Sequence, residues 1–249
     1  RQDPDIIMVG EIRDLETGGI ALAPTTPPTH RPVSGKAFKP QAFSELTQQA
    51  NNQERLKPLA LPFWQRVLSG GFVPGSVTLL GGEPGIGKST LLAQLALDLA
   101  SQGKTLLYVT GEESPNQVFG RFVRLQHRQS SDASNPSLPQ TLQFLDITDA
   151  ANIAATIAHT HPDLTIIDSI QSLRASEIPG EPGNPTQMKA AAALIHEQAK
   201  AHHSAVIFVG QVTKDGDLAG PRLLEHLVDT VLMMEGDRSQ MSRILRPTK

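Results

Sequence analysis

The most chemically informative segment is glycine-rich and spans residues 81–90, GGEPGIGKST. Within it, residues 82–89 match the pattern G-x-x-x-x-G-K-[ST] at every specified position. Glycines let the backbone turn so that successive N–H groups, with the start of the following helix, hold phosphate oxygens. Lys88 is expected to reach the β- and γ-phosphates, and Ser89 to supply a hydroxyl ligand to Mg²⁺. The predicted nucleotide-binding residues are Gly82, Glu83, Pro84, Gly85, Ile86, Gly87, Lys88, Ser89 and Thr90.

A candidate magnesium ligand lies at the end of the apolar run LTIID, where Asp168 is followed by Ser169. A carboxylate at the carboxyl end of a buried strand suits Mg²⁺ coordination, usually through water. The alternative is an aspartate that caps a turn or helix, which is common after strands. The upstream phosphate loop favours the metal role, with Ser89 as the other ligand.

Two adjacent glutamates, Glu112 and Glu113, follow another apolar run in LLYVTGEES. Phosphate hydrolysis needs a carboxylate to orient or deprotonate the attacking water. The alternatives are a solvated acidic turn, or stabilisation of the dipole of a helix that begins near Pro115. The residue pattern by itself does not separate the two glutamates.

Gln211 ends a further apolar run, AVIFVGQ. A polar side chain at this position can sense the γ-phosphate by hydrogen bonding. An ordinary polar strand end is an equally good interpretation of the residue alone.

The elements that must position these residues alternate along the chain. Apolar runs without alternation predict strands buried on both faces, at 77–81, 105–110, 142–147, 164–169, 205–210 and 230–235. Helices are predicted at 88–101, 115–127, 150–160, 186–203 and 222–228. This alternation predicts an α/β fold, a mostly parallel sheet flanked by helices. A strand before the phosphate loop and a helix after it supply the context that a chance glycine-rich turn would lack.

Local signals agree with these boundaries. Ser114 can cap a helix that has Pro115 at its first position, and Gln117 completes a capping box. Gly103 lies where a helix is expected to stop. Residues 128–141, RQSSDASNPSLPQT, are predicted to form a flexible insertion.

Composition divides the 249-residue chain into three zones: a short strand-like stretch at 1–23, a Pro/Gln/Asn-rich stretch at 24–58, and a regular domain at 59–249. The second zone is predicted to be a disordered linker. The net charge of −3 excludes a uniformly basic surface, although not a local basic patch. The absence of cysteine excludes thiolate zinc sites. No apolar run approaches a membrane span of about 20 residues, so we expect a cytoplasmic protein without membrane contact.

Taken together, the motifs resemble the RecA-like ATPase core of the bacterial RadA (Sms) recombination and repair family. The resemblance covers about residues 61–249 and includes GGEPGIGKST, LLYVTGEESPNQVFGRFVRL, TIIDSIQSL and the discriminating stretch GDLAGPRLLEHLVDTVL. It implies that Glu112 is the catalytic glutamate, that Asp168 binds magnesium, and that Gln211 is the sensor. Lys88 completes the implied catalytic set. The family more often has His at the sensor position.

The resemblance also implies ATP as the cofactor with Mg²⁺, and DNA as the partner. The family forms hexameric rings on single-stranded or branched DNA, acts with recombinase filaments and promotes branch migration. The implied DNA-binding candidates are the loop at 176–189, the segment at 213–222 with Lys214 and Arg222, and Lys249. From the residues alone, the two segments are equally typical of solvated surface loops.

The chain also departs from the family. It has no cysteine for the family's N-terminal zinc module, and no room for its C-terminal Lon-protease-like domain. Lys249 matches the first residue of the Lys-Asn-Arg-Phe-Gly motif, where the chain stops. Two alternatives to a DNA-dependent ATPase therefore stay open: a RecA-like regulatory ATPase that switches protein partners, and a fragment that binds ATP without efficient turnover.

The first residues, RQDPDIIMVGEIRDLETGGIALA, resemble the metal-binding strand region of secretion and pilus-assembly ATPases. Glu11 matches a catalytic carboxylate in that resemblance. However, the phosphate loop already has Asp168 and Glu112 as partners within its own domain. We therefore expect residues 1–23 to be an orphan fragment that contributes no chemistry.

Overall fold

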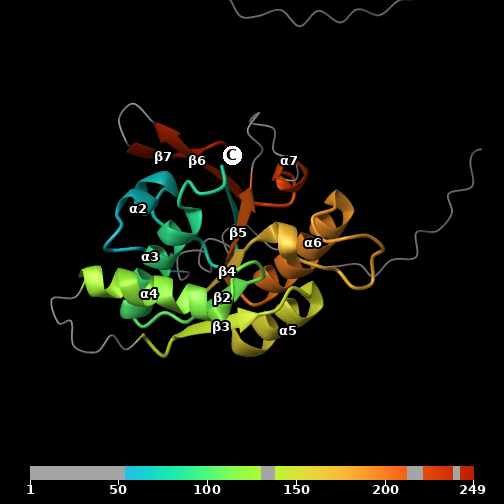
Figure 1. Ribbon diagram of the computed structural model, residues 1–249, viewed down its shortest axis with the longest axis horizontal. Helices are drawn as coiled ribbons and strands as arrows, with labels where there is room; N and C mark the ends of the chain where they lie inside the picture. The colour runs from blue at the N-terminus through green and yellow to red at the C-terminus, as the bar shows by residue number, and fades with distance from the viewer. Residues whose placement is uncertain (1–53, 130–137, 212–220, 238–241) are drawn as a thin grey trace, which may run out of the picture. The chain divides into compact units, whose positions relative to one another are not determined.

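The structure is a computed structural model that describes residues 54–129, 138–211, 221–237 and 242–249 (Figure 1). All of these belong to the unit Phe43–Lys249. The fragment predicted at 1–23 and nearly all of the linker predicted at 24–58 lie outside the described residues. The same is true of Lys214 and of the central part of the insertion predicted at 128–141.

Within the described residues, the strands form one seven-stranded sheet in the order β3-β2-β4-β5-β1-β6-β7 (Figure 1). Neighbours from β3 to β6 run parallel, and β7 runs antiparallel to β6. The α/β prediction with a mostly parallel sheet is therefore confirmed. The strands are β1 Val77–Gly82, β2 Leu106–Thr110, β3 Leu142–Asp146, β4 Leu164–Asp168, β5 Ala205–Gln211, β6 Thr230–Asp237 and β7 Ser242–Pro247.

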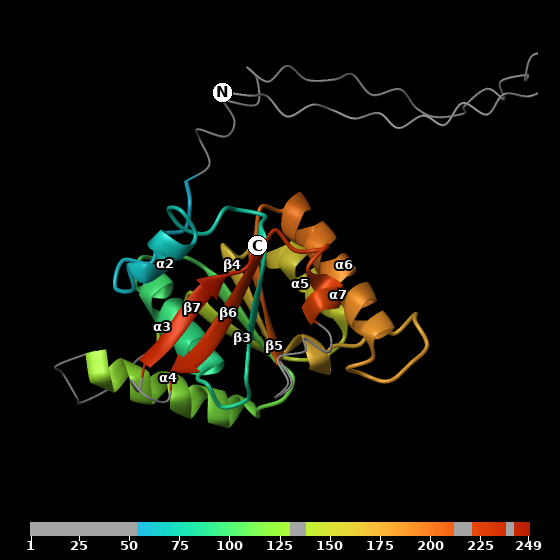
Figure 2. The same cartoon turned by 90° about the horizontal axis from the view of Figure 1, so that it is seen from above.

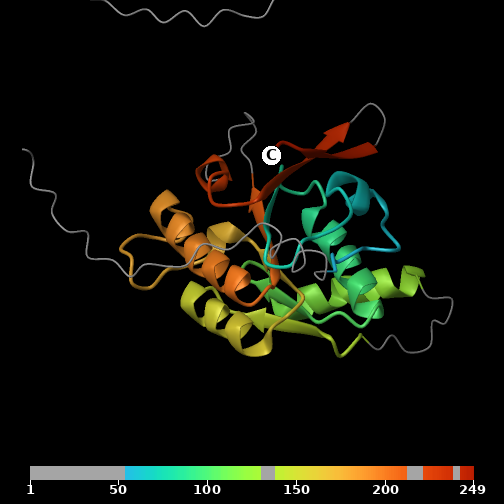
Figure 3. The same ribbon diagram turned by 180° about the vertical axis from the view of Figure 1, so that it is seen from behind.

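Helices cover both faces of this sheet (Figures 2 and 3). α2, α3 and α4 pack on one face and α5, α6 and α7 on the other, so neighbouring strand residues such as Leu79 and Leu80 enter opposite cores. In the part of the chain that is described, no helix has the length and apolar character needed to cross a membrane. The helices are α2 Phe63–Val67, α3 Lys88–Ser101, α4 Pro115–Gln129, α5 Ala150–Thr160, α6 Pro185–Ala201 and α7 Pro221–Leu224, with a 3-10 turn, η1, at Ile170–Ser172.

The predicted boundaries agree with the observed ones for β1 to β6 and for α3 to α6, with small differences at the ends. The side chain of Gln117 returns to accept a hydrogen bond from the Ser114 N–H at 3.0 Å, which confirms the Gln117 half of the capping box predicted for α4. The Ser114 hydroxyl donates to the same Gln117 oxygen at 3.1 Å. α3 ends at Ser101, shortly before Gly103, whose φ of +79° is left-handed. The stop predicted at this glycine is therefore confirmed.

The helix predicted at 222–228 is wrong beyond Leu224. The carbonyl oxygen of Leu224 accepts hydrogen bonds from both Leu227 N–H at 2.8 Å and Val228 N–H at 3.1 Å, which closes a turn. Asp229 N–H then donates to the Val77 carbonyl oxygen at 2.9 Å and leads the chain into β6. A turn that joins the sheet so soon leaves no length for further helix.

Candidate functional site

The phosphate loop joins β1 to α3, which is the order of strand, loop and helix that the motif requires. Gly82 passes so close to β6 that a Cβ at this position would lie 2.6 Å from the Met234 carbonyl oxygen. Gly87 is the N-cap of α3 and has a φ of 108°, a conformation that favours glycine. No described side chain caps this helix start. Its first N–H groups are therefore available to an anion.

Lys88 is buried in the first turn of α3. Its Nζ donates hydrogen bonds to the carbonyl oxygens of Gly82 at 2.7 Å and Glu83 at 3.0 Å. Burial lowers the pKa of Lys88, whereas the carboxylates of Asp168 and Glu112 raise it. The ammonium group is thus held over the loop, with acidic residues close by, in a place suited to binding phosphate.

One cavity of about 290 Å³ brings most of the predicted site residues together. Its walls come from the loop, from the start of α3, and from the carboxyl ends of β2, β4 and β5. Ligands of open α/β sheets bind outside these strand ends. The predicted loop residues Gly82, Glu83 and Ile86 are absent from its lining, which consists of Pro84, Gly85, Gly87, Lys88, Ser89, Thr90, Glu112, Glu113, Arg121, Asp168, Val209 and Gln211.

Asp168 ends β4 in the wall of this cavity, and its Oδ2 accepts a hydrogen bond from the Tyr108 hydroxyl at 3.0 Å. Burial and the Asp168 carboxylate raise the pKa of Tyr108, so the hydroxyl remains a donor. The described residues contain no group of three or more His, Cys, Asp or Glu side chains that could hold a metal by themselves. The hydroxyl of Ser89 and the carboxylate of Asp168 nevertheless fit Mg²⁺, which takes few protein ligands and completes its shell with phosphate and water oxygens.

The two adjacent glutamates have different partners. Glu112 Oε1 accepts a hydrogen bond from Ser169 Oγ, and its Oε2 accepts one from Gln211 Nε2 at 3.2 Å. Glu113 Oε1 instead accepts from Arg121 Nη2 at 2.5 Å. Glu112 therefore lies with the ends of β4 and β5, whereas Glu113 is bound to α4.

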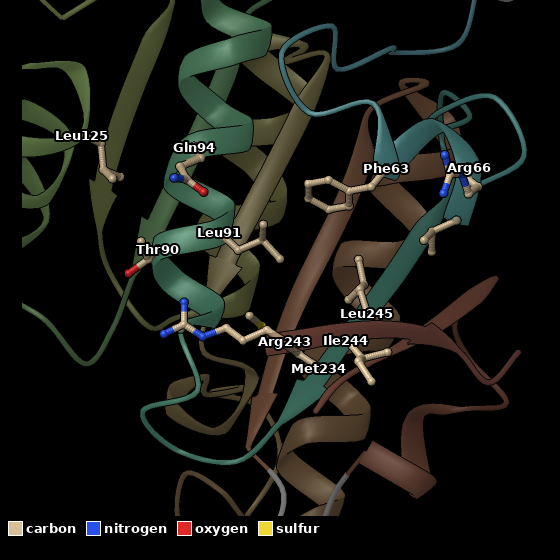
Figure 4. A pocket seen from close by; sticks show the side chains of 12 residues that line it. Phe63, Arg66, Thr90, Leu91, Gln94, Leu125, Met234, Arg243, Ile244 and Leu245 are labelled. Carbon is tan, nitrogen blue, oxygen red and sulfur yellow. The ribbon is translucent and has the colours of Figure 1, made fainter. Parts of the chain in front are cut away.

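A second pocket of about 570 Å³ adjoins the first and shares Gly87 and Thr90 with it (Figure 4). It lies between α2, α3, α4, β6 and β7. Arg243 of β7 extends toward the first turn of α3, beside Thr90. Its guanidinium group lies against Gly87, since a Cβ on Gly87 would come 3.3 Å from Nη1. The other lining residues are Phe63, Arg66, Val67, Leu91, Gln94, Leu125, Met234, Ile244 and Leu245.

The segment that carries Phe63 and Arg66 into this pocket is attached to α3. The buried Asp98 of α3 accepts a hydrogen bond from the Ala60 N–H at 2.9 Å. Trp64 of α2 is fully buried in the same core. These contacts place α2 beside α3.

Of the three residues predicted to bind DNA, the structure describes the side chain of Lys249 alone. Lys214 lies outside them, and Arg222 belongs to α7, but its side chain is outside the described part. Lys249 Nζ donates to the carbonyl oxygens of Glu225 at 2.6 Å and Val228 at 2.9 Å. In this position Lys249 holds the turn that follows α7.

The loop at 176–189 is largely exposed, but a buried side chain at the start of α6 organises it. Gln187 Oε1 accepts a hydrogen bond from Ala175 N–H at 2.7 Å, and its Nε2 donates to the carbonyl oxygens of Ile178 and, at 3.2 Å, Gly180. Lys189 lies exposed beyond it. Gln187 therefore anchors this exposed segment to the start of α6.

Several residues of the site were not predicted from the sequence, namely Arg121, Tyr108, Ser169 and Arg243. Tyr108 is a polar residue within an apolar strand, and Ser169 directly follows Asp168, so both offered a signal. Arg121 precedes the buried Phe122 on α4, which places it near the face that packs on the sheet. No comparable signal exists for Arg243, because β7 itself was not predicted.

Comparison with protein families gives two matches. A family described as "AAA domain" matches residues 54–217, which include the loop and both cavity-lining glutamates. A family described as "Type II/IV secretion system protein" matches residues 1–27. The second match agrees with the resemblance noted for the first residues of the chain.

The most similar curated relatives include proteins described as "DNA repair protein RadA". The protein of Streptococcus pneumoniae is 42% identical over 217 residues, which cover 87% of this chain and 48% of the relative. The protein of Listeria monocytogenes is 42% identical over 211 residues, 85% of this chain and 44% of the relative. The protein of Bacillus subtilis is 41% identical over 209 residues, 84% of this chain and 43% of the relative. The chain thus spans somewhat less than half the length of these relatives.

Proposed function

Because the chain belongs to the AAA domain family and its core is similar to bacterial RadA proteins, we propose that it is an ATP-hydrolysing DNA repair protein. The observation that carries this proposal is the convergence of Lys88, Ser89, Glu112, Asp168 and Gln211 on one cavity. These side chains come from the start of α3, from the turn after β2, and from the ends of β4 and β5, and each has a proposed role in phosphoryl transfer.

In the proposed bound state, the backbone N–H groups of the loop and the first turn of α3 hold the phosphates of ATP. Lys88 supplies a positive charge to the β- and γ-phosphates. Ser89 and Asp168 hold Mg²⁺, in part through water. When bound, Mg²⁺ neutralises charge on the phosphate oxygens during transfer.

Glu112 is the proposed catalytic carboxylate. It orients the attacking water and accepts its proton, the usual role of a carboxylate at such a site. Ser169 and Gln211 fix its two oxygens, so the side chain is already oriented before ATP arrives. Gln211 is the proposed sensor, since a γ-phosphate oxygen competes with Glu112 for its amide group.

We further propose that hydrolysis depends on DNA, single-stranded or branched, and serves recombinational repair and branch migration. The support is the similarity to relatives described as "DNA repair protein RadA". The exposed loop at 176–189 and the segment at 213–222 are the proposed contacts. The same proposal includes a RecA-like ATPase domain from 59 to 249 that assembles into a ring of six copies. It also includes contact with a recombinase filament and action in the cytoplasm.

The test measures equilibrium binding of ATP and its hydrolysis, with Mg²⁺ and with or without single-stranded DNA, for the chain and its Lys88→Ala variant. We expect binding, DNA-stimulated hydrolysis, and loss of both in the variant. ATP binding that is unchanged by Lys88→Ala would remove the loop assignment. Hydrolysis without DNA stimulation, accompanied by nucleotide-dependent oligomers, would instead favour a regulatory ATPase. Binding without hydrolysis would contradict the catalytic part of the proposal.

A further inference from the structure

Arg121 lies in the wall of the phosphate cavity, and none of the roles proposed above uses it. It belongs to α4, and its side chain is 18% exposed. Its Nη2 donates to Glu113 Oε1 at 2.5 Å. Burial lowers the pKa of Arg121, but the hydrogen bond to Glu113 and the negative charges of Glu113 and Asp168 raise it. A positive charge is thus fixed at the side of the cavity formed by the ends of β2 and β4.

Two atoms of this ion pair have no hydrogen-bond partner among the described residues. Arg121 Nη1 and Glu113 Oε2 are buried, and neither has a hydrogen-bond partner within the described residues. Buried polar atoms in native proteins are nearly always paired, because an unpaired one loses its hydration without compensation. An ion pair that served only to attach α4 to the end of β2 would be expected to satisfy these atoms. The unpaired donor and acceptor therefore indicate a polar ligand.

The position of Arg121 identifies the part of the ligand that it meets. Arg121 lines the cavity that contains Asp168, Glu112 and Gln211, and is absent from the lining of the adjoining pocket that contains Arg243. The two spaces meet at Gly87 and Thr90. A nucleotide whose α-phosphate lies at this junction has its terminal phosphate among the strand ends, on the side where Arg121 lies.

We propose that Arg121 binds the terminal phosphate of the nucleotide through Nη1, so that the site distinguishes a nucleoside triphosphate from a diphosphate. This inference rests on the proposed ATP binding. Glu113 orients the guanidinium plane, and its free Oε2 accepts a hydrogen bond from water next to the same phosphate. A planar guanidinium with several fixed donors suits both contacts at once, which a lysine would not. When the terminal phosphate leaves, Arg121 keeps only Glu113.

The experiment compares the affinities of AMP-PNP and ADP, each with Mg²⁺, by titration calorimetry. Arg121→Ala is expected to weaken AMP-PNP binding about tenfold or more, as loss of a charged hydrogen bond does, while ADP binding changes little. Arg124→Ala removes an exposed arginine of the same helix and should change neither affinity. Arg121→Lys should keep only part of the preference for AMP-PNP.

A purely structural role gives a different result. Arg121→Ala leaves the carboxylate of the half-buried Glu113 without its cation, so the double variant Glu113→Ala/Arg121→Ala is needed to remove that unpaired charge. We expect the double variant to regain thermal stability but not the preference for AMP-PNP. The inference would be overturned if the double variant regained both thermal stability and the preference for AMP-PNP. It would also be overturned if Arg121→Ala weakened the binding of AMP-PNP and ADP equally. A wild-type chain that binds neither nucleotide would instead overturn the proposed ATP binding on which it rests.

Discussion

Gln211 donates a hydrogen bond to Glu112 at 3.2 Å and thereby joins the end of β5 to the residues that follow β2. The strand between them is β4, which ends at Asp168. The proposed sensor, metal ligand and catalytic carboxylate therefore stand at three neighbouring strands. A change at the γ-phosphate that moves Gln211 also changes the hydrogen bonding of Glu112.

Glu112→Gln is expected to lower the rate of ATP hydrolysis about 100-fold or more, because an amide does not accept the proton of the attacking water. ATP affinity should change little, since Lys88 and the loop are untouched. Single-turnover hydrolysis and equilibrium binding measure the two effects separately. The control variant Glu113→Gln should hydrolyse ATP faster than Glu112→Gln. The reverse order would exchange the proposed roles of the glutamates.

The sequence predicted the part of the fold that depends on long apolar runs. β4 and β5 are buried over nearly their whole length, so their composition identifies them without any knowledge of neighbours. β7 could not be predicted in this way. It is an edge strand with exposed Arg243 and Arg246, and its pairing with β6 defines it more than its own residues do.

The same division holds for the site. The phosphate loop and Asp168 were predicted because their chemistry is contained in a local motif and its strand. Glu112 and Glu113 were not separable by residue pattern, since their difference comes from where Ser169, Gln211 and Arg121 lie after folding. Those partners come from three other parts of the chain, so the spacing of residues around the two glutamates does not predict these contacts.

The pocket beside Arg243 is expected to hold the nucleoside of ATP. It opens from the phosphate cavity at Gly87 and Thr90 and has apolar walls such as Leu91 and Leu245. ATP should therefore bind more tightly than inorganic tripolyphosphate. Arg243→Ala should weaken ATP binding about two- to fivefold through loss of a guanidinium that stacks on the base, and leave tripolyphosphate binding unchanged.

Arg246→Ala is the matched control for that measurement. Arg246 lies on the same strand, but it pairs with Glu235 at 3.5 Å and does not line the pocket. Its replacement should leave the affinities for ATP and tripolyphosphate as they are. Equal affinity of the wild type for the two ligands would contradict the nucleoside assignment.

Glu11→Gln is expected to leave ATP binding and hydrolysis unchanged. Residues 1–27 match a secretion-system family, whereas the AAA domain match begins at residue 54. The loop already has Asp168 and Glu112 in its own cavity, so a carboxylate from another ATPase family has no place in the reaction. Steady-state ATPase assays of the wild type and the Glu11→Gln variant measure this. A large loss of turnover in the variant would show that the first residues act in catalysis.

Asp149 should stabilise the fold in a pH-dependent way. It is the N-cap of α5, where it accepts hydrogen bonds from Asn152 N–H at 2.9 Å and from Ser176 Oγ at 2.5 Å. The bond from Ser176 and those from the helix N–H groups lower its pKa. The Asp149 carboxylate therefore contributes its full stabilisation above the pKa of aspartate in the unfolded chain, about 3.9, and this stabilisation is lost as pH falls through the lower folded value.

At neutral pH, Asp149→Ala should cost about 1 kcal/mol in the free energy of unfolding, and Asp149→Asn less, because the amide oxygen still caps the helix. Urea unfolding at pH 7 and near pH 3, with the exposed Asp146→Ala as control, measures both effects. A loss for Asp149→Ala that is the same at the two pH values would show that the charge of Asp149 has no part in the cap.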